Sequence, residues 1–178
     1  MRRRVLCLLT DGFEEIETVT PVDVLRRSGV EVVIAALRGK SATGRCGMRL
    51  EADAALADLD SSGFDMLLIP GGPGVGDLRS DGRAAMLARD FASLGKPVAA
   101  ICAAPLVLMD AGLLEGKRFT AFRSVREELG CGLDERVVVD GNLITSRGAG
   151  TALDFALALV ARLAGQSAAE AVADEIMA

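Results

Sequence analysis

The chain has 178 residues, 51% of them hydrophobic and 25% charged, a balance typical of one soluble globular domain over residues 1–178. The net charge of −5, with no basic run beyond Arg2–Arg4, argues against nucleic-acid binding. No stretch approaches the roughly 20 apolar residues that span a bilayer. Asp11 interrupts the apolar run that a secretory signal would need, so we expect a cytoplasmic protein without membrane partners.

The first part of the chain alternates between strand and helix signals. The apolar run at 4–10 predicts a strand, and helical spacing at 17–29 predicts a helix that ends at a glycine. The β-branched run at 30–37 predicts a second strand. Residues 39–63 are less regular and predict a loop with a short strand and a helical turn. Residues 64–72 predict a strand that ends in proline and glycine.

The middle of the chain continues this alternation. Residues 80–95 predict an amphipathic helix with Ser80 as its N-cap. A buried strand is expected at 97–101. It leads into a helix at 104–112 that carries Pro105 in its first turn, where a missing N–H is tolerated.

The last third predicts a strand at 116–122, a short helix at 124–130 and a strongly apolar helix at 150–165. Residues 136–146 predict two strands around an Asp-Gly-Asn hairpin turn. The whole order predicts an α/β fold, a doubly wound and mostly parallel sheet with helices on both faces.

Three predicted loops should meet at one edge of this sheet, because ligands bind beyond the carboxyl ends of parallel strands. They are "DGFEEIE" after the first strand, "PGGPGVGD" after the 64–69 strand, and the turn at Cys102 after the 97–101 strand. A cysteine, a group of carboxylates and a glycine-rich turn would then converge.

Cys102 has two interpretations. Cysteine is often buried, so it could be a core residue. Its small neighbours Ala103 and Ala104 would also allow a sharp turn into a helix N-terminus, which favours a reactive thiolate with a pKa below about 8.5. Cys7 lies in the middle of a strand and is expected to be inert. The chain contains no histidine, so cysteine chemistry would have to proceed without an imidazole base.

The acidic loop and the glycine turn also have two interpretations each. Of Glu14, Glu15 and Glu17, at least two are expected to be ordinary helix N-terminal acids. One carboxyl turned toward Cys102 could donate a hydrogen bond to the thiolate. The Gly71–Gly72 pair could be an ordinary turn, or could bring backbone N–H groups close to a substrate oxygen.

A metal site is not expected. The four cysteines form no C-x-x-C pair and there is no histidine, so the usual zinc ligand sets are missing.

Taken together, these segments resemble the ThiJ/PfpI superfamily and its DJ-1 group nearly end to end. The similarity lies in "DGFEEIETVTPVDVLRRSG", "LIPGGPG", "AAICAAP" and "LITSRGAGTALDFAL", of which the first and third are the most specific.

The resemblance implies a flavodoxin-like α/β sandwich with Cys102 as the reactive cysteine. It maps a protonated glutamate of the family onto Glu17 and places the backbone N–H groups of Gly72 and Ala103 at the oxyanion position. The family's anion-binding arginine falls on Arg27, and Gly71 is assigned to the same substrate-binding group. No cofactor is implied.

The departures from the family pattern bear on function. Protease-like members carry histidine where this chain has Ala103, and the DJ-1 group often carries histidine where it has Phe122. Hydrolysis of peptide bonds is therefore disfavoured. The resemblance implies glyoxalase or deglycase chemistry on methylglyoxal or its adducts. The alternative is a redox sensor or stress chaperone that works through oxidation of Cys102.

A homodimer is also expected from the resemblance. The first helix offers an apolar face beside Arg26 and Arg27, and a dimer would place Arg27 near the partner's site.

Overall fold

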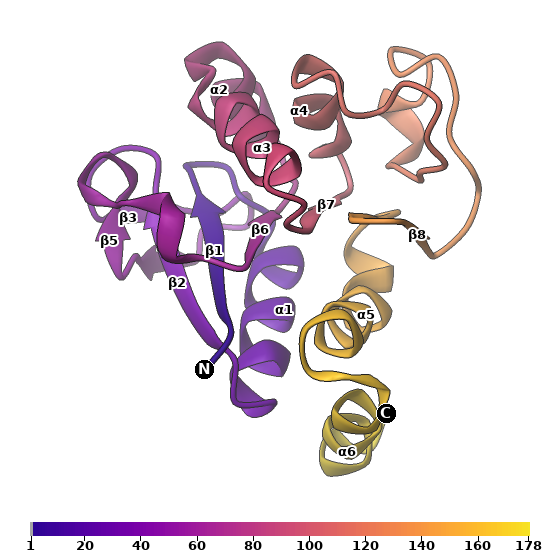
Figure 1. Ribbon diagram of the computed structural model, residues 1–178. Coiled ribbons are helices and arrows are strands. Elements are labelled where there is room, and N and C mark those ends of the chain that lie inside the picture. Colours follow the sequence, from indigo (N-terminus) through magenta and orange to yellow (C-terminus); the bar gives the residue numbers. More distant parts are fainter. Residues whose placement is uncertain (1) are drawn as a thin grey trace.

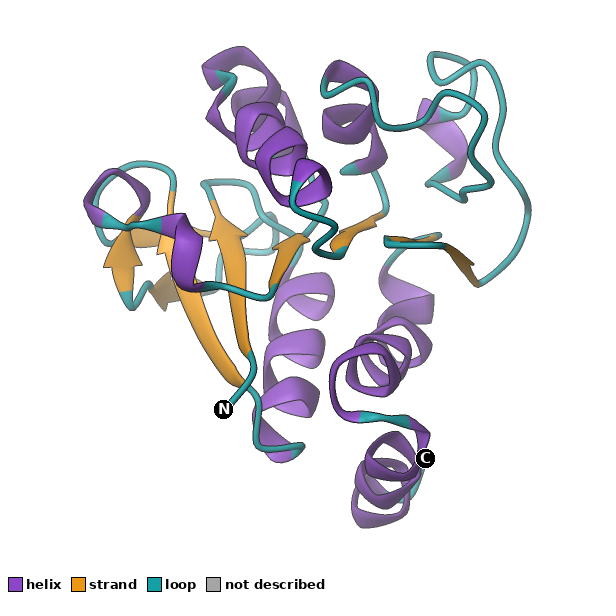
Figure 2. Cartoon of the chain, viewed as in Figure 1, coloured by secondary structure: helices purple, strands orange, loops and turns teal. Residues whose placement is uncertain are grey.

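The computed structural model describes residues 2–178 and contains one seven-stranded sheet of order β5-β2-β1-β6-β7-β9-β8 (Figure 1, Figure 2). Neighbouring strands run parallel, except that β8 and β9 form an antiparallel hairpin. A separate hairpin is formed by β3 and β4. The strands are β1 (Arg4–Leu9), β2 (Glu31–Ala36), β3 (Ser41–Thr43), β4 (Arg49–Glu51), β5 (Ala54–Ala55), β6 (Met66–Ile69), β7 (Val98–Ile101), β8 (Val137–Asp140) and β9 (Leu143–Ser146). The predicted fold class is confirmed.

Helices cover both faces of the sheet. Figure 1 shows α2, α3 and α4 gathered on one side, and α1, α5 and α6 on the other. The helices are α1 (Glu15–Arg27), α2 (Val75–Asp81), α3 (Arg83–Ser93), α4 (Pro105–Asp110), α5 (Ala152–Ala164) and α6 (Gln166–Ile176). Short 3₁₀ turns are η1 (Leu56–Asp58), η2 (Ser61–Gly63), η3 (Arg123–Val125) and η4 (Ala149–Thr151). Within residues 2–178, no helix combines the length and apolar character that a membrane crossing requires.

The central strand β1 shows why the core has two halves. Successive side chains of a strand point to opposite faces. Val5, Cys7 and Leu9 therefore pack in the cluster beneath α1, α5 and α6. Leu6 and Leu8 pack in the cluster beneath α2, α3 and α4. All of these side chains are buried, so β1 reads as a continuous apolar run rather than an alternating one.

Two predicted helical features are wrong. The helix expected at 80–95 is two helices, because Gly82 adopts a left-handed conformation (φ 82°) that ends α2 and precedes α3. Ser80 is not an N-cap. It lies inside α2, where its hydroxyl donates to the Gly76 carbonyl at 2.9 Å.

The segments predicted at 116–122 and 124–130 are also different. The first is not a strand of the sheet, and its Thr120 makes an isolated bridge to Leu133. The second begins as the short turn η3 and continues as turns rather than as a helix. The hairpin turn of 136–146 is confirmed, with Gly141 in a left-handed conformation between β8 and β9.

Candidate functional site

Cys102 lies at a strained turn between β7 and α4. Its φ of 66° is left-handed, which among the described non-glycine residues is shared only with Met177 near the C-terminus. Such a conformation costs on the order of 1–3 kcal/mol and persists only where the surroundings hold it. Here the Cys102 N–H donates to the Ser146 carbonyl at 2.9 Å, and its carbonyl accepts from the Phe122 N–H at 2.8 Å. The turn is thus fixed from both sides.

Glu17 is the acidic residue that faces this cysteine. Its side chain is almost fully buried, 1% exposed, and one carboxylate oxygen accepts from the Gly71 N–H at 3.1 Å. The Cys102 side chain and the backbone N–H of Ala149 also lie close enough to the carboxyl group to lower its pKa. Since Cys102 is 8% exposed, the two groups form a buried pair that opens only slightly to solvent.

The two other glutamates of the loop are structural, as expected for at least two of the three. Glu14 is the N-cap of α1, and its side chain accepts from the Glu17 N–H at 2.8 Å. Glu15 accepts from the backbone N–H of Cys46 at 2.8 Å and so ties the β3–β4 hairpin to the start of α1. These N–H donors hold the pKa of Glu15 below its usual value although burial acts in the opposite direction.

The glycine turn after β6 lies directly against Glu17 and Cys102. A side chain at Gly71 would overlap the Glu17 carboxylate and lie 2.6 Å from Cβ of Cys102, so only glycine fits there. Gly72 has a left-handed φ of 99°, and the backbone of Gly12 leaves no room for a side chain. Its N–H and that of Ala103 lie close enough to the Cys102 sulfur to lower the pKa of the thiol. The sulfur therefore lies among two N–H donors and one carboxyl group.

The pKa of Cys102 differs from the sequence expectation. Burial, followed by the charge and hydrogen bond of Glu17, raises it to about 12, although the Gly72 and Ala103 N–H groups act to lower it. Burial also raises the pKa of Glu17 from 4.5 to about 7. Because each group penalises a second negative charge, the pair holds one shared proton over a wide pH range and titrates as a unit. From the sequence, the helix N-terminus is expected to lower the pKa of the Cys102 thiol. That expectation is wrong, because burial and the charge of Glu17 outweigh the helix N-terminus.

The structure thus brings together five of the six predicted site residues, and Arg27 is the exception. It lies ten residues along α1 from Glu17, a span of about 15 Å at the helical rise per residue. Its guanidinium is paired with Asp23 at 2.9 Å and with Glu175 at 2.7 Å. Within one chain Arg27 does not join the site.

The remaining cysteines lie elsewhere. Cys7 is fully buried in β1, and burial raises its pKa to about 12, in agreement with its expected inertness. Cys46 and Cys131 are exposed and all four cysteines are free thiols.

A cavity of about 620 Å³ adjoins the Cys102 turn and was not predicted. Gly148 and Ala149 form the part of its wall next to Glu17, Phe122 lines it beside Gly148, and Arg126 and Arg147 line it as well. The sequence signal was present in "FRSVRE" and "SRG", but the arginines come from separate loops that only the fold brings together.

The chain is similar to known proteins in sequence and in fold. Residues 3–162 match the model of the DJ-1/PfpI family. A Bacillus subtilis protein, YraA, whose name carries a provisional assignment as a cysteine protease, is 43% identical over 152 residues, covering 83% of this chain and 90% of its own. A deglycase of Pyrococcus abyssi is 36% identical over 148 residues, covering 81% and 89%. The crystal structure of Drosophila melanogaster DJ-1beta has a TM-score of 0.95 at 38% identity and covers 99% of this chain and 98% of its own.

Proposed function

Because the chain belongs to the DJ-1/PfpI family, we propose that it is a Cys102-dependent enzyme that acts on small reactive carbonyls, with glyoxalase or deglycase chemistry on methylglyoxal or its adducts. One observation carries the proposal. The Cys102 sulfur lies beside the Glu17 carboxyl and the N–H groups of Gly72 and Ala103, and all three act on the pKa of the thiol. A nucleophile, a proton carrier and donors for a developing negative charge are the parts that carbonyl addition needs.

The first step is addition. The Cys102 thiolate attacks the aldehyde carbon, the carbonyl π electrons move to oxygen, and that oxygen takes the proton from Glu17. The product is a hemithioacetal. The N–H groups of Gly72 and Ala103 lie near the sulfur in the free site. They are therefore close enough to stabilise the charge as it moves from sulfur to oxygen.

The second step is an internal transfer of hydrogen. Glu17, now ionised, removes the proton from the former aldehyde carbon and returns it to the neighbouring ketone carbon. The hydroxyl proton of the hemithioacetal passes to the ketone oxygen, so the first carbon is oxidised to a thioester and the second is reduced to an alcohol, and no external oxidant is needed. Water then hydrolyses the thioester to lactate and frees the thiol. A carboxyl with a pKa of about 7 can both give and take a proton near neutral pH.

Two features support carbonyl chemistry over peptide hydrolysis. The chain has no histidine, so no imidazole can activate the thiol or protonate a leaving amine. Phe122, at the position where the DJ-1 group often carries histidine, supplies no proton-transfer group. Relatives named as deglycases, from Pyrococcus abyssi and Thermococcus kodakarensis, are consistent with the carbonyl assignment.

The test is lactate formation from methylglyoxal by the purified chain and by Cys102→Ser. Turnover that depends on Cys102 supports the proposal. Turnover equal to that of Cys102→Ser would refute it.

A second candidate is oxidation sensing through Cys102. The N–H groups of Gly72 and Ala103 and the Glu17 carboxyl would also be suited to bind the oxygens of a sulfinate. Peroxide titration followed by intact mass separates the two. Stoichiometric oxidation at Cys102 without methylglyoxal turnover would favour the sensor.

We also propose a homodimer formed through α1. Ile16 and Val19 lie three residues apart on this helix and are 52% and 42% exposed, and Met48 of the adjacent hairpin is 55% exposed. Large apolar side chains grouped on one face are typical of an interface. A dimer formed through α1 would place Arg27 near the partner's site, whereas Arg27 does not reach the site of its own chain.

A further inference from the structure

The cavity beside Cys102 is bounded by arginines from two loops. Arg123 and Arg126 come from the segment after Phe122, Arg136 directly precedes β8 and Arg147 directly follows β9. Its volume of about 620 Å³ lies within the usual range for small-molecule sites. For a chain with a net charge of −5, this concentration of positive charge is unusual.

The cavity is connected to the cysteine by direct contacts. Phe122 donates to the Cys102 carbonyl at 2.8 Å, and Cys102 donates to the carbonyl of Ser146, the residue before Arg147. Gly148 lies against both the Phe122 ring and a Glu17 carboxylate oxygen. Phe122 and Gly148 thus line the cavity and also contact the Cys102–Glu17 pair.

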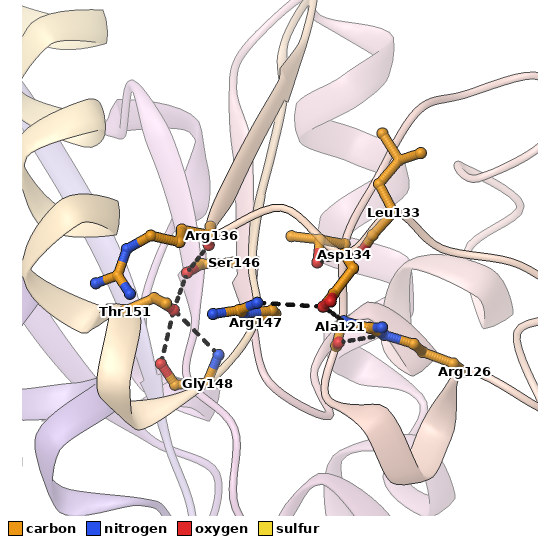
Figure 3. Close-up of polar contacts among 10 residues, drawn as sticks. Ala121, Arg126, Leu133, Asp134, Arg136, Ser146, Arg147, Gly148 and Thr151 are labelled. Atoms are coloured by element: carbon orange, nitrogen blue, oxygen red, sulfur yellow. Dashed lines mark hydrogen bonds and ion pairs between the residues drawn. The ribbon is translucent and has the colours of Figure 1, made fainter.

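The arginines already bind one carboxylate there. In Figure 3, Arg147 and Arg126 converge on Asp134, and one oxygen of Asp134 accepts from them at 3.1 Å and 2.9 Å. These two guanidinium groups hold the pKa of Asp134 below its usual value. Asp134 is an exposed residue, so the carboxylate is held by the arginines rather than by burial.

Positive charge remains after the acidic partners are counted. Arg136 is paired with Asp154 at 2.6 Å. Asp134 offers one negative charge to both Arg126 and Arg147. Among the described residues, the Arg147 guanidinium has no hydrogen-bond partner apart from Asp134, and Arg123 has no acidic partner. Glu17 is the other acidic group near the cavity, at its inner end.

We infer that this cavity binds the carboxylate of the substrate, so that the chain prefers carbonyl compounds carrying an anionic group a few bonds from the reacting carbon. The inference rests on the proposed role of Cys102. A planar guanidinium binds a carboxylate with two parallel hydrogen bonds, which suits the free N–H groups of Arg147. Phe122, 38% exposed at the same cavity, offers an apolar surface for the carbon chain between the two groups.

The experiment compares two alkylating reagents of equal length, N-iodoacetylglycine, which is anionic, and N-iodoacetylglycinamide, which is neutral. The readout is the ratio of their rates of Cys102 labelling, measured by mass spectrometry. A ratio cancels any change in thiol ionisation, because both reagents react with the same thiolate. The same ratio for N-acetylcysteine gives the value without a cavity.

In the unmodified chain the ratio should exceed that of N-acetylcysteine, and it should fall as salt is added. Arg147→Gln should lower it about threefold or more, as expected for loss of a partly exposed ion pair. Asp134→Asn should raise it, because the internal carboxylate no longer competes for Arg147. Arg38→Gln, at an exposed arginine outside the cavity, is the matched control and should leave it unchanged.

A ratio in Arg147→Gln equal to that in Arg38→Gln would overturn the inference. This outcome is distinct from failure of the proposed function. A chain that shows the arginine-dependent ratio but does not convert methylglyoxal would support the carboxylate site and refute the glyoxalase proposal.

Discussion

Gly71 and Glu17 fit together in a way that allows no side chain at position 71. The Gly71 N–H donates to the Glu17 carboxylate at 3.1 Å, and an added Cβ would overlap that same carboxylate and lie 2.6 Å from Cβ of Cys102. The glycine turn therefore sets the distance between the proposed proton carrier and the proposed nucleophile.

Gly71→Ala should separate this pair. We expect it to reduce both methylglyoxal turnover and iodoacetamide labelling of Cys102, and to destabilise the fold by about 1–3 kcal/mol, the usual cost of overpacking. Urea unfolding and labelling kinetics measure the two effects.

The matched control is Gly76→Ala in α2, where an added Cβ meets nothing within 4 Å. It should retain activity and be neutral or slightly stabilising, because alanine favours helix over glycine. Full activity in Gly71→Ala would contradict the assigned role of the turn.

Burial of Glu17 should make the stability of the fold depend on pH. Its pKa is raised from 4.5 to about 7, so the folded state holds a proton that the unfolded state releases at lower pH. The associated stability is fully present below about pH 4.5 and is lost as the pH rises through about 7. Glu17→Gln cannot ionise and should avoid this loss.

The measurement is the free energy of unfolding of both chains in urea at pH 4.5 and pH 8. Relative to the unmodified chain, Glu17→Gln should gain up to about 3 kcal/mol between these two values. Glu127→Gln, at an exposed glutamate, should show no such gain. An equal difference at both pH values would show that Glu17 is not held protonated by the fold.

Most of the sheet could be predicted from sequence because β1, β2, β6 and β7 are short apolar runs bounded by turn residues. The same logic failed at 116–122, which has a strand-like composition. Its backbone pairs at Thr120 with Leu133 rather than with the edge of the sheet. Edge pairing is decided by tertiary contacts that local composition does not encode.

The candidate site, like the sheet, could be predicted from the sequence only in part. Cys102, Glu17 and the glycine turn could be placed together because all three follow strands that end at one edge of the sheet. The rise in the pKa of Cys102 could not be foreseen, since it depends on how deeply the sulfur is buried and on the Glu17 charge beside it. The arginine cavity was missed because Arg126 and Arg147 are 21 positions apart and lie outside the predicted strands, so that only the fold brings them together.

The shared proton predicts how Cys102 responds to pH. Labelling by iodoacetamide should rise through a step near pH 7, where the pair loses its first proton. Exposed Cys131 in the same digest is the comparison thiol. A flat profile across this range would contradict the coupling.

Replacement of Glu17 should separate labelling from turnover. Glu17→Gln removes the charge that opposes ionisation of Cys102 and keeps a hydrogen-bond donor, so labelling should persist. It has no transferable proton, so methylglyoxal turnover should fall by a factor of about 10² or more. Glu17→Asp shortens the reach and should slow both. If Glu17→Gln retained full turnover, Glu17 would have no part in the proposed mechanism.

The apolar face of α1 predicts a dimer at micromolar concentration. Val19 is 42% exposed in the single chain, so Val19→Asp should be tolerated by the fold. In a dimer the same position would be buried, and two unpaired carboxylates would face each other or an apolar surface, which is costly. Analytical ultracentrifugation should therefore show twice the 18.5 kDa mass for the unmodified chain and a shift toward the single mass for Val19→Asp.

Met86→Asp, at a similarly exposed methionine of α3, is the control and should leave the mass unchanged. An unmodified chain that sediments only at 18.5 kDa would refute the dimer, and with it the proposed place of Arg27 near the partner's site.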